Sequence, residues 1–335
     1  MPVAFNHEQV RQLLLELGGF IRQRLIEVRA ERSDLAMVAR QDVADTIYEI
    51  DRVSEVVIAR WFEQSWPAGV PVEVVMEGVD PAQTLTFPAG IGVGRTRLKL
   101  ILDPIDGTRG IMYDKRPAWF LAGAAPQKGA DTTVADIEVA VMVELPTSKQ
   151  WRSDALSAIR GRGYQAHAAN VFTGEAFPLS LRPSQATDFR HGFAYFSRFF
   201  PAGKARTAQL EEDLWVALGY SHGKEEVIFE DQYISTGGQF YEVLAGHDRL
   251  IGDVRPLVHE MLGLKDGLHC HPYDVAAGLV LTEAGVILEK PFGGALDAPL
   301  DTTSSVSWML YANPHLAEQV RPRLRKLLEE ALKKL

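Results

Sequence analysis

One short segment constrains the fold of this chain more than any other, because it places two carboxylates at the end of an apolar strand. The run Leu100-Ile101-Leu102 leads directly into Asp103-Pro104-Ile105-Asp106-Gly107-Thr108. A short apolar run bounded by turn residues predicts a buried strand. Pro104 stiffens the following turn by fixing its own φ, and Gly107 lets backbone N–H groups approach an anion closely. The segment therefore predicts a tight turn that presents Asp103 and Asp106 together.

Two carboxylates three residues apart on such a turn are suited to a hard divalent cation. Mg²⁺ prefers oxygen ligands in near-octahedral geometry and usually keeps several waters. Two such ions, bridged by one carboxylate, can clamp both the attacking and the leaving oxygen of an in-line displacement. Thr108 adds a hydroxyl that can orient a water. An Asp-Gly pair alone is a common turn signal, so the prediction depends on the whole hexad after an apolar strand.

The spacing of the acids excludes one rival phosphatase loop, that of the haloacid dehalogenase type. That loop carries its nucleophilic Asp two residues before its second Asp. Here the residue two before Asp106 is Pro104, so the nucleophile of that mechanism is missing.

The composition narrows the class of protein and its partners. The chain has 335 residues, 46% of them hydrophobic, with 35 basic and 44 acidic residues and a formal net charge of −9. These values are typical of a globular protein with two packed subdomains or one large domain, and an acidic chain is poorly suited to nucleic acid or an anionic membrane. No signal-peptide pattern or membrane-spanning apolar run is found, and the single Cys270 cannot form an internal disulfide. We therefore expect a cytoplasmic protein with no nucleic acid polymer and no membrane as partner.

Hydrophobic periodicity predicts a β-rich first half behind two helices and a second half in which strands and helices alternate. A boundary near residues 182–184 divides the chain into an N-terminal α+β subdomain, residues 1–183, and a C-terminal α/β subdomain, residues 184–335. Pro272 predicts that Asp274 lies in the first turn of a helix. Helices are expected at about residues 6–25, 50–64, 204–218, 238–245, 272–283 and 314–332. Strands are expected at about 72–76, 98–102, 118–124, 137–143, 226–229, 249–251 and 286–288, with further β-structure and turns over 160–183.

Four segments together resemble the inositol monophosphatase family, the Mg²⁺-dependent and often lithium-sensitive phosphomonoesterases. The hexad from Asp103 to Thr108 resembles the metal-binding motif of that family. The other three segments follow the order of the family over residues 38–314, and they are Glu49-Ile50-Asp51, Val74-Val75-Met76-Glu77, and Pro272-Tyr273-Asp274-Val275-Ala276-Ala277-Gly278 with Glu283-Ala284-Gly285. On this basis the chain is identified as a divergent, bacterial-type member.

The resemblance implies both a fold and a set of metal ligands. The fold would be an α/β (α+β) protein, layered αβαβα like the inositol monophosphatases and fructose-1,6-bisphosphatases. The first Mg²⁺ would be bound by Glu77, Asp103 and the carbonyl of Ile105, and the second by Asp103, Asp106 and Asp274. A third, weaker ion would be held with the help of Glu77. Most ligands then come from the N-terminal subdomain, and the C-terminal subdomain closes the site.

The resemblance also implies catalytic and substrate-binding residues. Thr108 and Glu77 would position the attacking water, with Asp51 near Thr108. The amides of Gly107 and Thr108 would hold the phosphate. The remaining residues on the substrate side would be Arg109, Gly237, Gly238 and Asp274. A homodimer is the assembly that the family suggests.

Two departures from the family pattern bear on the substrate. Arg109, Lys115 and Arg116 follow the hexad and could meet a second phosphate, although a solvated charged loop explains them equally well. No Glu aligns with the family residue that reads inositol hydroxyls, and an insertion is apparent around residues 256–264.

The expected function is Mg²⁺-dependent hydrolysis of a small phosphate monoester, inositol phosphate-like or a sugar phosphate, by a phosphoric monoester hydrolase. Two alternatives remain open. One is a bisphosphate-specific phosphatase, either a 3′(2′),5′-bisphosphate nucleotidase or a sugar bisphosphatase. The other is a non-catalytic, metal-binding member of the family.

Overall fold

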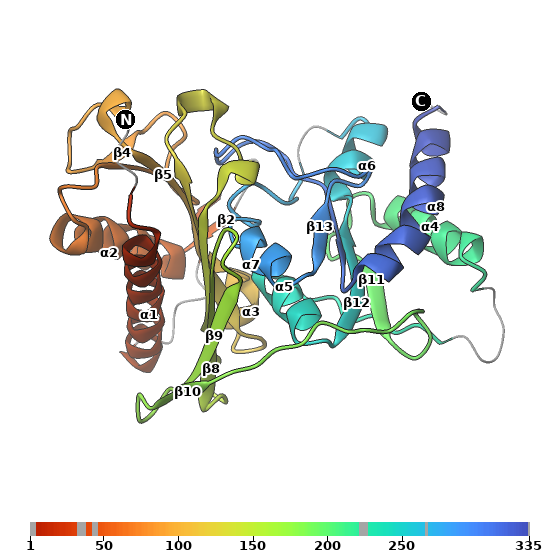
Figure 1. The fold of residues 1–335 in the computed structure, drawn as a ribbon, viewed down its shortest axis with the longest axis horizontal. Coiled ribbons are helices and arrows are strands. Elements are labelled where there is room, and N and C mark those ends of the chain that lie inside the picture. The colour runs from red at the N-terminus through yellow and green to blue at the C-terminus, as the bar shows by residue number, and fades with distance from the viewer. Residues whose placement is uncertain (1–4, 32–37, 42–45, 221–226, 265–266, 334–335) are drawn as a thin grey trace.

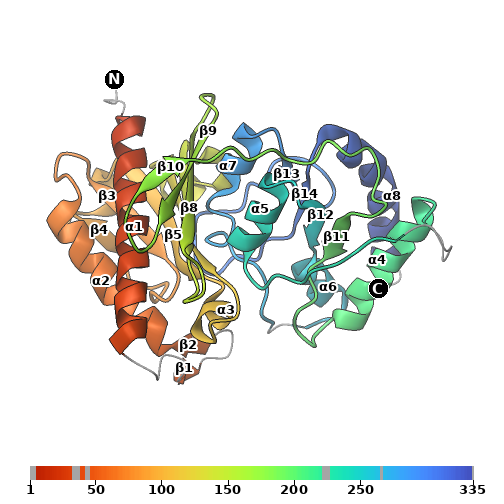
Figure 2. The ribbon, with the colours of Figure 1, turned by 90° about the horizontal axis from the view of Figure 1, so that it is seen from below.

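The chain folds into five layers that alternate between helices and sheets. A computed structural model describes residues 5–31, 38–41, 46–220, 227–264 and 267–333, and the side chains of residues 30–56 lie outside this description. Helices α1 (His7–Glu31) and α2 (Glu49–Ser65) cover the outer face of a large sheet, and α5 (Thr236–Leu244) and α7 (Gly278–Glu283) separate that sheet from a smaller one (Figure 1). Helices α4 (Lys204–Ala217) and α8 (Pro314–Leu332) cover the far face of the smaller sheet (Figure 2). The predicted αβαβα layering is therefore confirmed.

The larger sheet carries the strand that ends in the two acids. Its order is β10-β9-β8-β7-β6-β5-β3-β4, in which only β3 and β5 pair in parallel. Every residue of β5 is buried, in agreement with the buried strand predicted from its apolar run Leu100-Ile101-Leu102. The strands are β3 (Val72–Met76), β4 (Leu85–Phe87), β5 (Leu98–Asp106), β6 (Ala118–Pro126), β7 (Val139–Leu145), β8 (Arg152–Ile159), β9 (Tyr164–Asn170) and β10 (Ala176–Pro178).

The smaller sheet has the order β11-β12-β14-β13, with β11 and β12 parallel and the other pairs antiparallel. Its strands are β11 (Phe193–Phe196), β12 (Asp248–Asp253), β13 (Ile287–Glu289) and β14 (Trp308–Tyr311). The remaining elements are the hairpin β1 (Val38–Gln41) and β2 (Thr46–Tyr48), the helices α3 (Thr108–Met112) and α6 (Arg255–Met261), and the 3₁₀ turns Val93–Arg95, Gly129–Asp131 and Val134–Asp136.

Alternation along β5 decides which way its acids point. Leu100 and Leu102 pack in the core under α1 and α2, whereas Ile101 belongs to the core between the two sheets. Successive side chains of a strand point to opposite faces. Asp103, two residues after Ile101, therefore faces the smaller sheet.

The helix predicted over residues 272–283 is wrong in its first half. Residues 272–277 form consecutive turns and α7 begins only at Gly278. The reason is local, because the amides of Asp274, Ala276 and Gly278 bond to carbonyls three residues back rather than four. Asp274 thus precedes the helix instead of occupying its first turn.

Several other elements differ from the sequence prediction. Strands β8 and β14, the hairpin β1–β2, and the short helices α3 and α6 were not predicted. Of the strand expected at 226–229, residue 226 lies outside the described residues and Phe229 makes only an isolated bridge to Phe193. Within the described part of the chain, no helix is both long and apolar enough to cross a membrane.

Candidate metal centre

Asp103 and Asp106 reach the same space because β5 is irregular between them. Its pairing with β6 shifts register between these two residues. The side chains are buried, with exposed fractions of 1% for Asp103 and 6% for Asp106. The Ile105 N–H donates to Asp103 Oδ1 at 3.0 Å and fixes that carboxylate within its own turn.

Asp106 is held from across the molecule by the start of α5. Its carboxylate accepts hydrogen bonds from Ser235 Oγ at 2.7 Å, the Thr236 N–H at 3.1 Å and the Gly237 N–H at 2.5 Å. Ser235 also caps α5 by accepting the Gly238 N–H at 2.9 Å. Sequence reasoning missed Ser235 as a partner of Asp106, since the Ser-Thr-Gly-Gly sequence signals only a helix cap and the two residues are 129 positions apart.

The predicted substrate residues Gly237 and Gly238 are buried at the start of α5. A Cβ on Gly237 would lie 2.7 Å from Cβ of Trp119, and one on Gly238 would overlap the ring of Tyr233. Their amides donate to Asp106 and Ser235. In this structure both glycines therefore support the carboxylate through close packing.

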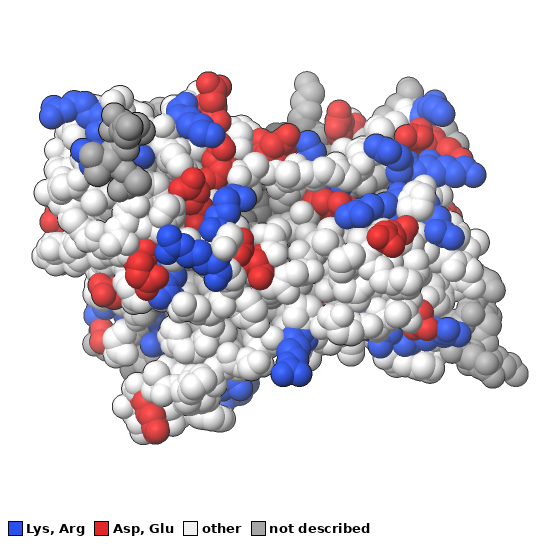
Figure 3. Space-filling model, viewed as in Figure 1, with Lys and Arg blue, Asp and Glu red and all other residues white. Residues whose placement is uncertain are grey.

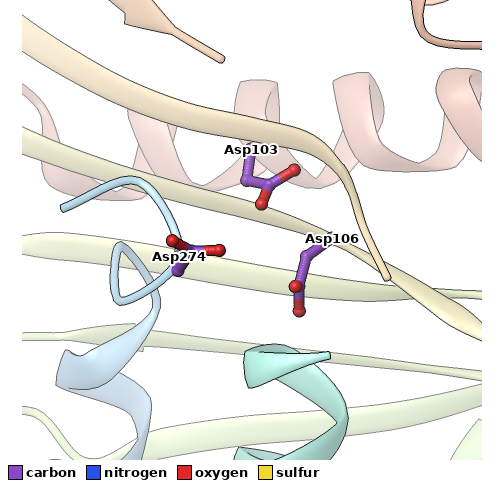
Figure 4. Close-up of side chains that lie close together, drawn as sticks. All are labelled: Asp103, Asp106 and Asp274. Carbon is purple, nitrogen blue, oxygen red and sulfur yellow. The ribbon is translucent and has the colours of Figure 1, made fainter. Parts of the chain in front are cut away.

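Asp274 comes from the other half of the chain and completes the group. The His271 N–H donates to Asp274 Oδ2 at 2.6 Å and orients the side chain within its turn. Carboxylate oxygens of Asp103, Asp106 and Asp274 all lie within 4.8 Å of one another (Figure 4). Among the described residues, no other group of three His, Cys, Asp or Glu side chains meets this condition.

Burial and the closeness of like charges raise the pKa values of the three carboxylates. Burial, together with the charges of Glu77, Asp106 and Asp274, raises the pKa of Asp103 well above 3.8. Burial and the charge of Asp274 raise the pKa of Asp106 to about 7, against the hydrogen bonds from Ser235 and the two amides. Burial raises the pKa of Asp274 to about 7 as well. A nearby cation would relieve this cost.

No basic side chain of the described residues forms an ion pair with these three acids, so the protein itself does not neutralise them by direct contact. Two buried carboxylates and the partly exposed Asp274, with converging oxygens and no ion pair to a described basic side chain, form a donor set that fits a divalent cation with a preference for oxygen ligands, such as Mg²⁺.

The other predicted ligands lie beside this group. Glu77 directly follows β3, its N–H donates to the carbonyl of Leu102 at 3.2 Å, and its side chain is hydrogen-bonded to Asp103. The Thr108 hydroxyl donates to the carbonyl oxygen of Ile105 at 2.8 Å. Gly107, between them, has a φ of 93°, a conformation that favours glycine. The side chain of Asp51 lies outside the described residues.

The basic residues after Thr108, of which Arg109 lies in α3, are partly engaged in protein contacts. The Arg116 guanidinium binds both oxygens of Asp231, at 2.6 and 2.7 Å, and lies over the ring of Tyr233. Arg109 lies 5.7 Å from the ring centre of Phe200, and Lys115 is exposed. The pairing of Arg116 weakens the argument that all three cations meet a second phosphate.

The rest of the acidic surplus shows no such concentration on the face drawn in Figure 3. There, acidic and basic side chains are interspersed without a large field of one sign.

Comparisons with known proteins bear on the fold. No protein-family model matches the sequence, and no curated protein matches it. Solved structures do match over nearly the whole length. The extragenic suppressor protein SuhB of Bartonella henselae is 18% identical, with a TM-score of 0.63, over 96% of this chain and 99% of its own.

Two further structures match in the same way. The Leishmania major fructose-1,6-bisphosphatase is 11% identical, with a TM-score of 0.65, over 98% of this chain and 94% of its own. Inositol monophosphatase II of Staphylococcus aureus is 16% identical, with a TM-score of 0.59, over 97% and 95%. At such identities the likeness establishes that this chain shares their fold.

Proposed function

We propose that this chain, which has the fold of inositol monophosphatases and fructose-1,6-bisphosphatases, is a Mg²⁺-dependent phosphoric monoester hydrolase. Its substrate would be a small phosphorylated metabolite, inositol phosphate-like or a sugar phosphate. The observation that carries the proposal is the convergence of Asp103, Asp106 and Asp274 within 4.8 Å from the two halves of the chain. The order of the motifs, the fold and the converging carboxylates support a divergent member of the inositol monophosphatase family.

Five groups would hold two or three Mg²⁺ ions in this proposal. They are the carboxylates of Glu77, Asp103, Asp106 and Asp274 and the carbonyl of Ile105. When bound, Mg²⁺ supplies charge stabilisation to the phosphoryl oxygens and makes a water more acidic. Ser235 and the first amides of α5 would keep Asp106 oriented while it binds.

The chain's own groups would then bind the phosphate and place the water. The amides of Gly107 and Thr108 would donate to phosphoryl oxygens, which the left-handed conformation of Gly107 allows to come close. The Thr108 hydroxyl and the Glu77 carboxylate would orient the water, and the Glu77 carboxylate would accept its proton, with Asp51 supporting Thr108. The water oxygen would form a bond to phosphorus as the bond from phosphorus to the ester oxygen breaks, and the leaving alkoxide would take a proton from solvent water.

Bisphosphate hydrolysis is the second candidate. It is favoured by Arg109, which directly follows Thr108 and so stands beside the phosphate-binding amides of this proposal. We prefer a monoester substrate because Arg116 is already paired with Asp231, which leaves fewer cations for a second phosphate. We further propose a cytoplasmic homodimer, since the family suggests a dimer and the one thiol, Cys270, is free and buried.

A phosphate-release screen over sugar, inositol and nucleotide phosphates, with Mg²⁺ or with excess EDTA, tests the proposal. We expect turnover only with Mg²⁺, loss of turnover in Asp103→Asn, and normal turnover in the matched control Asp297→Asn, an exposed acid paired with Lys290. Full activity of Asp103→Asn, or of the wild type in EDTA, would contradict the mechanism. If the protein binds Mg²⁺ but hydrolyses no compound of the panel, the non-catalytic alternative would be favoured.

A further inference from the structure

The apparent insertion around residues 256–264 forms most of helix α6, and this helix has no part in the function proposed above. α6 spans Arg255–Met261, and Arg255 and His259 are two of its buried polar residues. They are four positions apart and so project from the same face of the helix. Their contacts show what that face holds in place.

Arg255 binds the segment that leads to Asp274. Its guanidinium pairs with Asp253 at the end of β12, with Nε 2.9 Å from Oδ1 and the closest terminal nitrogen 2.5 Å from Oδ2. A further N–H donates to the carbonyl of Leu268 at 3.1 Å. Leu268 lies six residues before Asp274, so Arg255, a residue that is only 8% exposed, ties this segment to the sheet.

The same guanidinium also packs on a second segment. It lies 4.7 Å from the ring centre of Phe199 and 5.4 Å from that of Phe200. Arg109, in α3, also lies over Phe200. Phe200 therefore connects Arg255, in the half that carries Asp274, with the half that carries Asp103 and Asp106.

His259 holds the same two segments one turn further along α6. Its Nε2 donates to the carbonyl of Ala202 at 3.3 Å, two residues after Phe200. On the other side, Gly267 packs so closely on the His259 ring that a Cβ there would overlap it. The ring of His269 also contacts that of His259, with 5.7 Å between the two ring centres.

We propose that α6 holds the segment before Asp274 in place and that Arg255 is a positioning residue. Arg255 would set the distance and orientation of Asp274 relative to Asp103 and Asp106. The inference rests on the metal site of the proposed function. Mg²⁺ demands near-ideal octahedral geometry, so its affinity depends on how firmly the ligands are placed. Residues that orient metal ligands typically contribute 10–100-fold in affinity or activity.

Titration of Mg²⁺ into the substrate-free protein by calorimetry tests this role without relying on turnover. The variants are Arg255→Lys, which keeps the charge and loses the planar fork, and Arg255→Met, which loses both. Arg11 provides the matched control. Its side chain is 9% exposed, as is that of Arg255, and it binds both oxygens of Glu8 on α1, at the outer face of the larger sheet.

We expect both Arg255 variants to raise the dissociation constant of Mg²⁺ roughly 10–100-fold. Arg11→Lys and Arg11→Met should leave it within about twofold of wild type, even where urea denaturation shows an equal loss of stability. The turnover number at saturating Mg²⁺ should change less than the Mg²⁺ concentration required for half-maximal rate. Phe199→Leu, at a half-buried site, serves if the Arg255 variants do not fold, and should weaken Mg²⁺ binding in the same direction.

Three results would overturn the inference. Wild-type Mg²⁺ affinity in both Arg255 variants would leave Arg255 with a merely structural role. Full affinity in Arg255→Lys alone would show that charge, rather than placement, is what matters. A wild type that binds no Mg²⁺ would remove the site itself, whereas one that binds Mg²⁺ and hydrolyses nothing would contradict only the proposed function.

Discussion

Replacing Asp274 with asparagine isolates the cost of its charge, because asparagine keeps the shape of the side chain and loses only the ability to ionise. The amide oxygen can still accept the His271 N–H that now donates to Oδ2. In the metal-free protein, burial raises the pKa of Asp274 from 3.8 to about 7. Between these values the folded protein holds a proton that the unfolded chain has lost.

The magnitude follows from this difference in proton binding. A shift from 3.8 to about 7 corresponds to an upper bound of about 4 kcal/mol of unfolding free energy above pH 7. Asp274 is partly exposed and water screens part of this cost, so we expect Asp274→Asn to stabilise the metal-free protein by about 2 kcal/mol at pH 8. A raised carboxyl pKa makes stability fall as pH rises from about 4 to about 7. The advantage of the variant is therefore small near pH 4 and complete above pH 7.

Urea denaturation of both proteins in EDTA, near pH 4.5 and at pH 8, measures this difference. With Mg²⁺ the order should reverse at pH 8, because an ion at 100-fold excess over its dissociation constant stabilises the folded wild type by about 2.7 kcal/mol, and the variant lacks one ligand. Equal stabilities at pH 8 in EDTA would refute the reasoning. So would an advantage of the variant that is the same at both pH values.

Three further changes have defined outcomes. Ser235→Ala removes a donor to Asp106 and should weaken Mg²⁺ binding about tenfold by calorimetry. Unchanged affinity would mean that the two amides suffice to hold Asp106. Gly237→Ala places a Cβ 2.7 Å from Trp119 and should cost about 1–3 kcal/mol in urea denaturation, and a neutral effect would show that α5 can shift away from the sheet. Arg109→Gln should raise KM more than about tenfold for a bisphosphate substrate and less than threefold for a monophosphate, if bisphosphates are the substrate; an equal effect on both would favour the monoester.

The sequence predicts best where apolar periodicity is strong. The run Leu100-Ile101-Leu102 that leads into Asp103 is apolar and buried, so the strand and the turn that follows it could be predicted. Strand β8 was missed because Ser153, Asp154 and Ser157 give it the composition of a loop, although all three are buried. Partners distant in sequence satisfy them, among them Tyr241, which donates to Asp154. No local pattern reports such pairing.

In the candidate site, too, local sequence patterns predict only the contacts between residues close in sequence. The two acids of the hexad are linked by a single turn, so their proximity follows from sequence. The contact of Ser235 with Asp106 joins positions 129 apart and appears only in the fold. The proline before Asp274 predicted a helix start, but the chain takes consecutive turns there and α7 begins at Gly278. The role of α6 was equally hidden, because Arg255 acts through segments that precede and follow it in the chain.

Asp103 and Asp106 belong to the larger sheet, whereas Asp274 precedes a helix that lies between the sheets, so the proposed cation site takes its ligands from two layers of the fold. Whatever draws the two halves together brings the three carboxylates into register and tightens their hold on an ion. By thermodynamic reciprocity, an ion that occupies the site must draw the halves together by the same free energy. Mutual repulsion of the ionised acids acts in the opposite sense when no ion is present. If the proposed cation binds here, its occupancy would favour a shorter spacing of the halves, and a pair of spectroscopic labels on α1 and α8 would report it without any substrate.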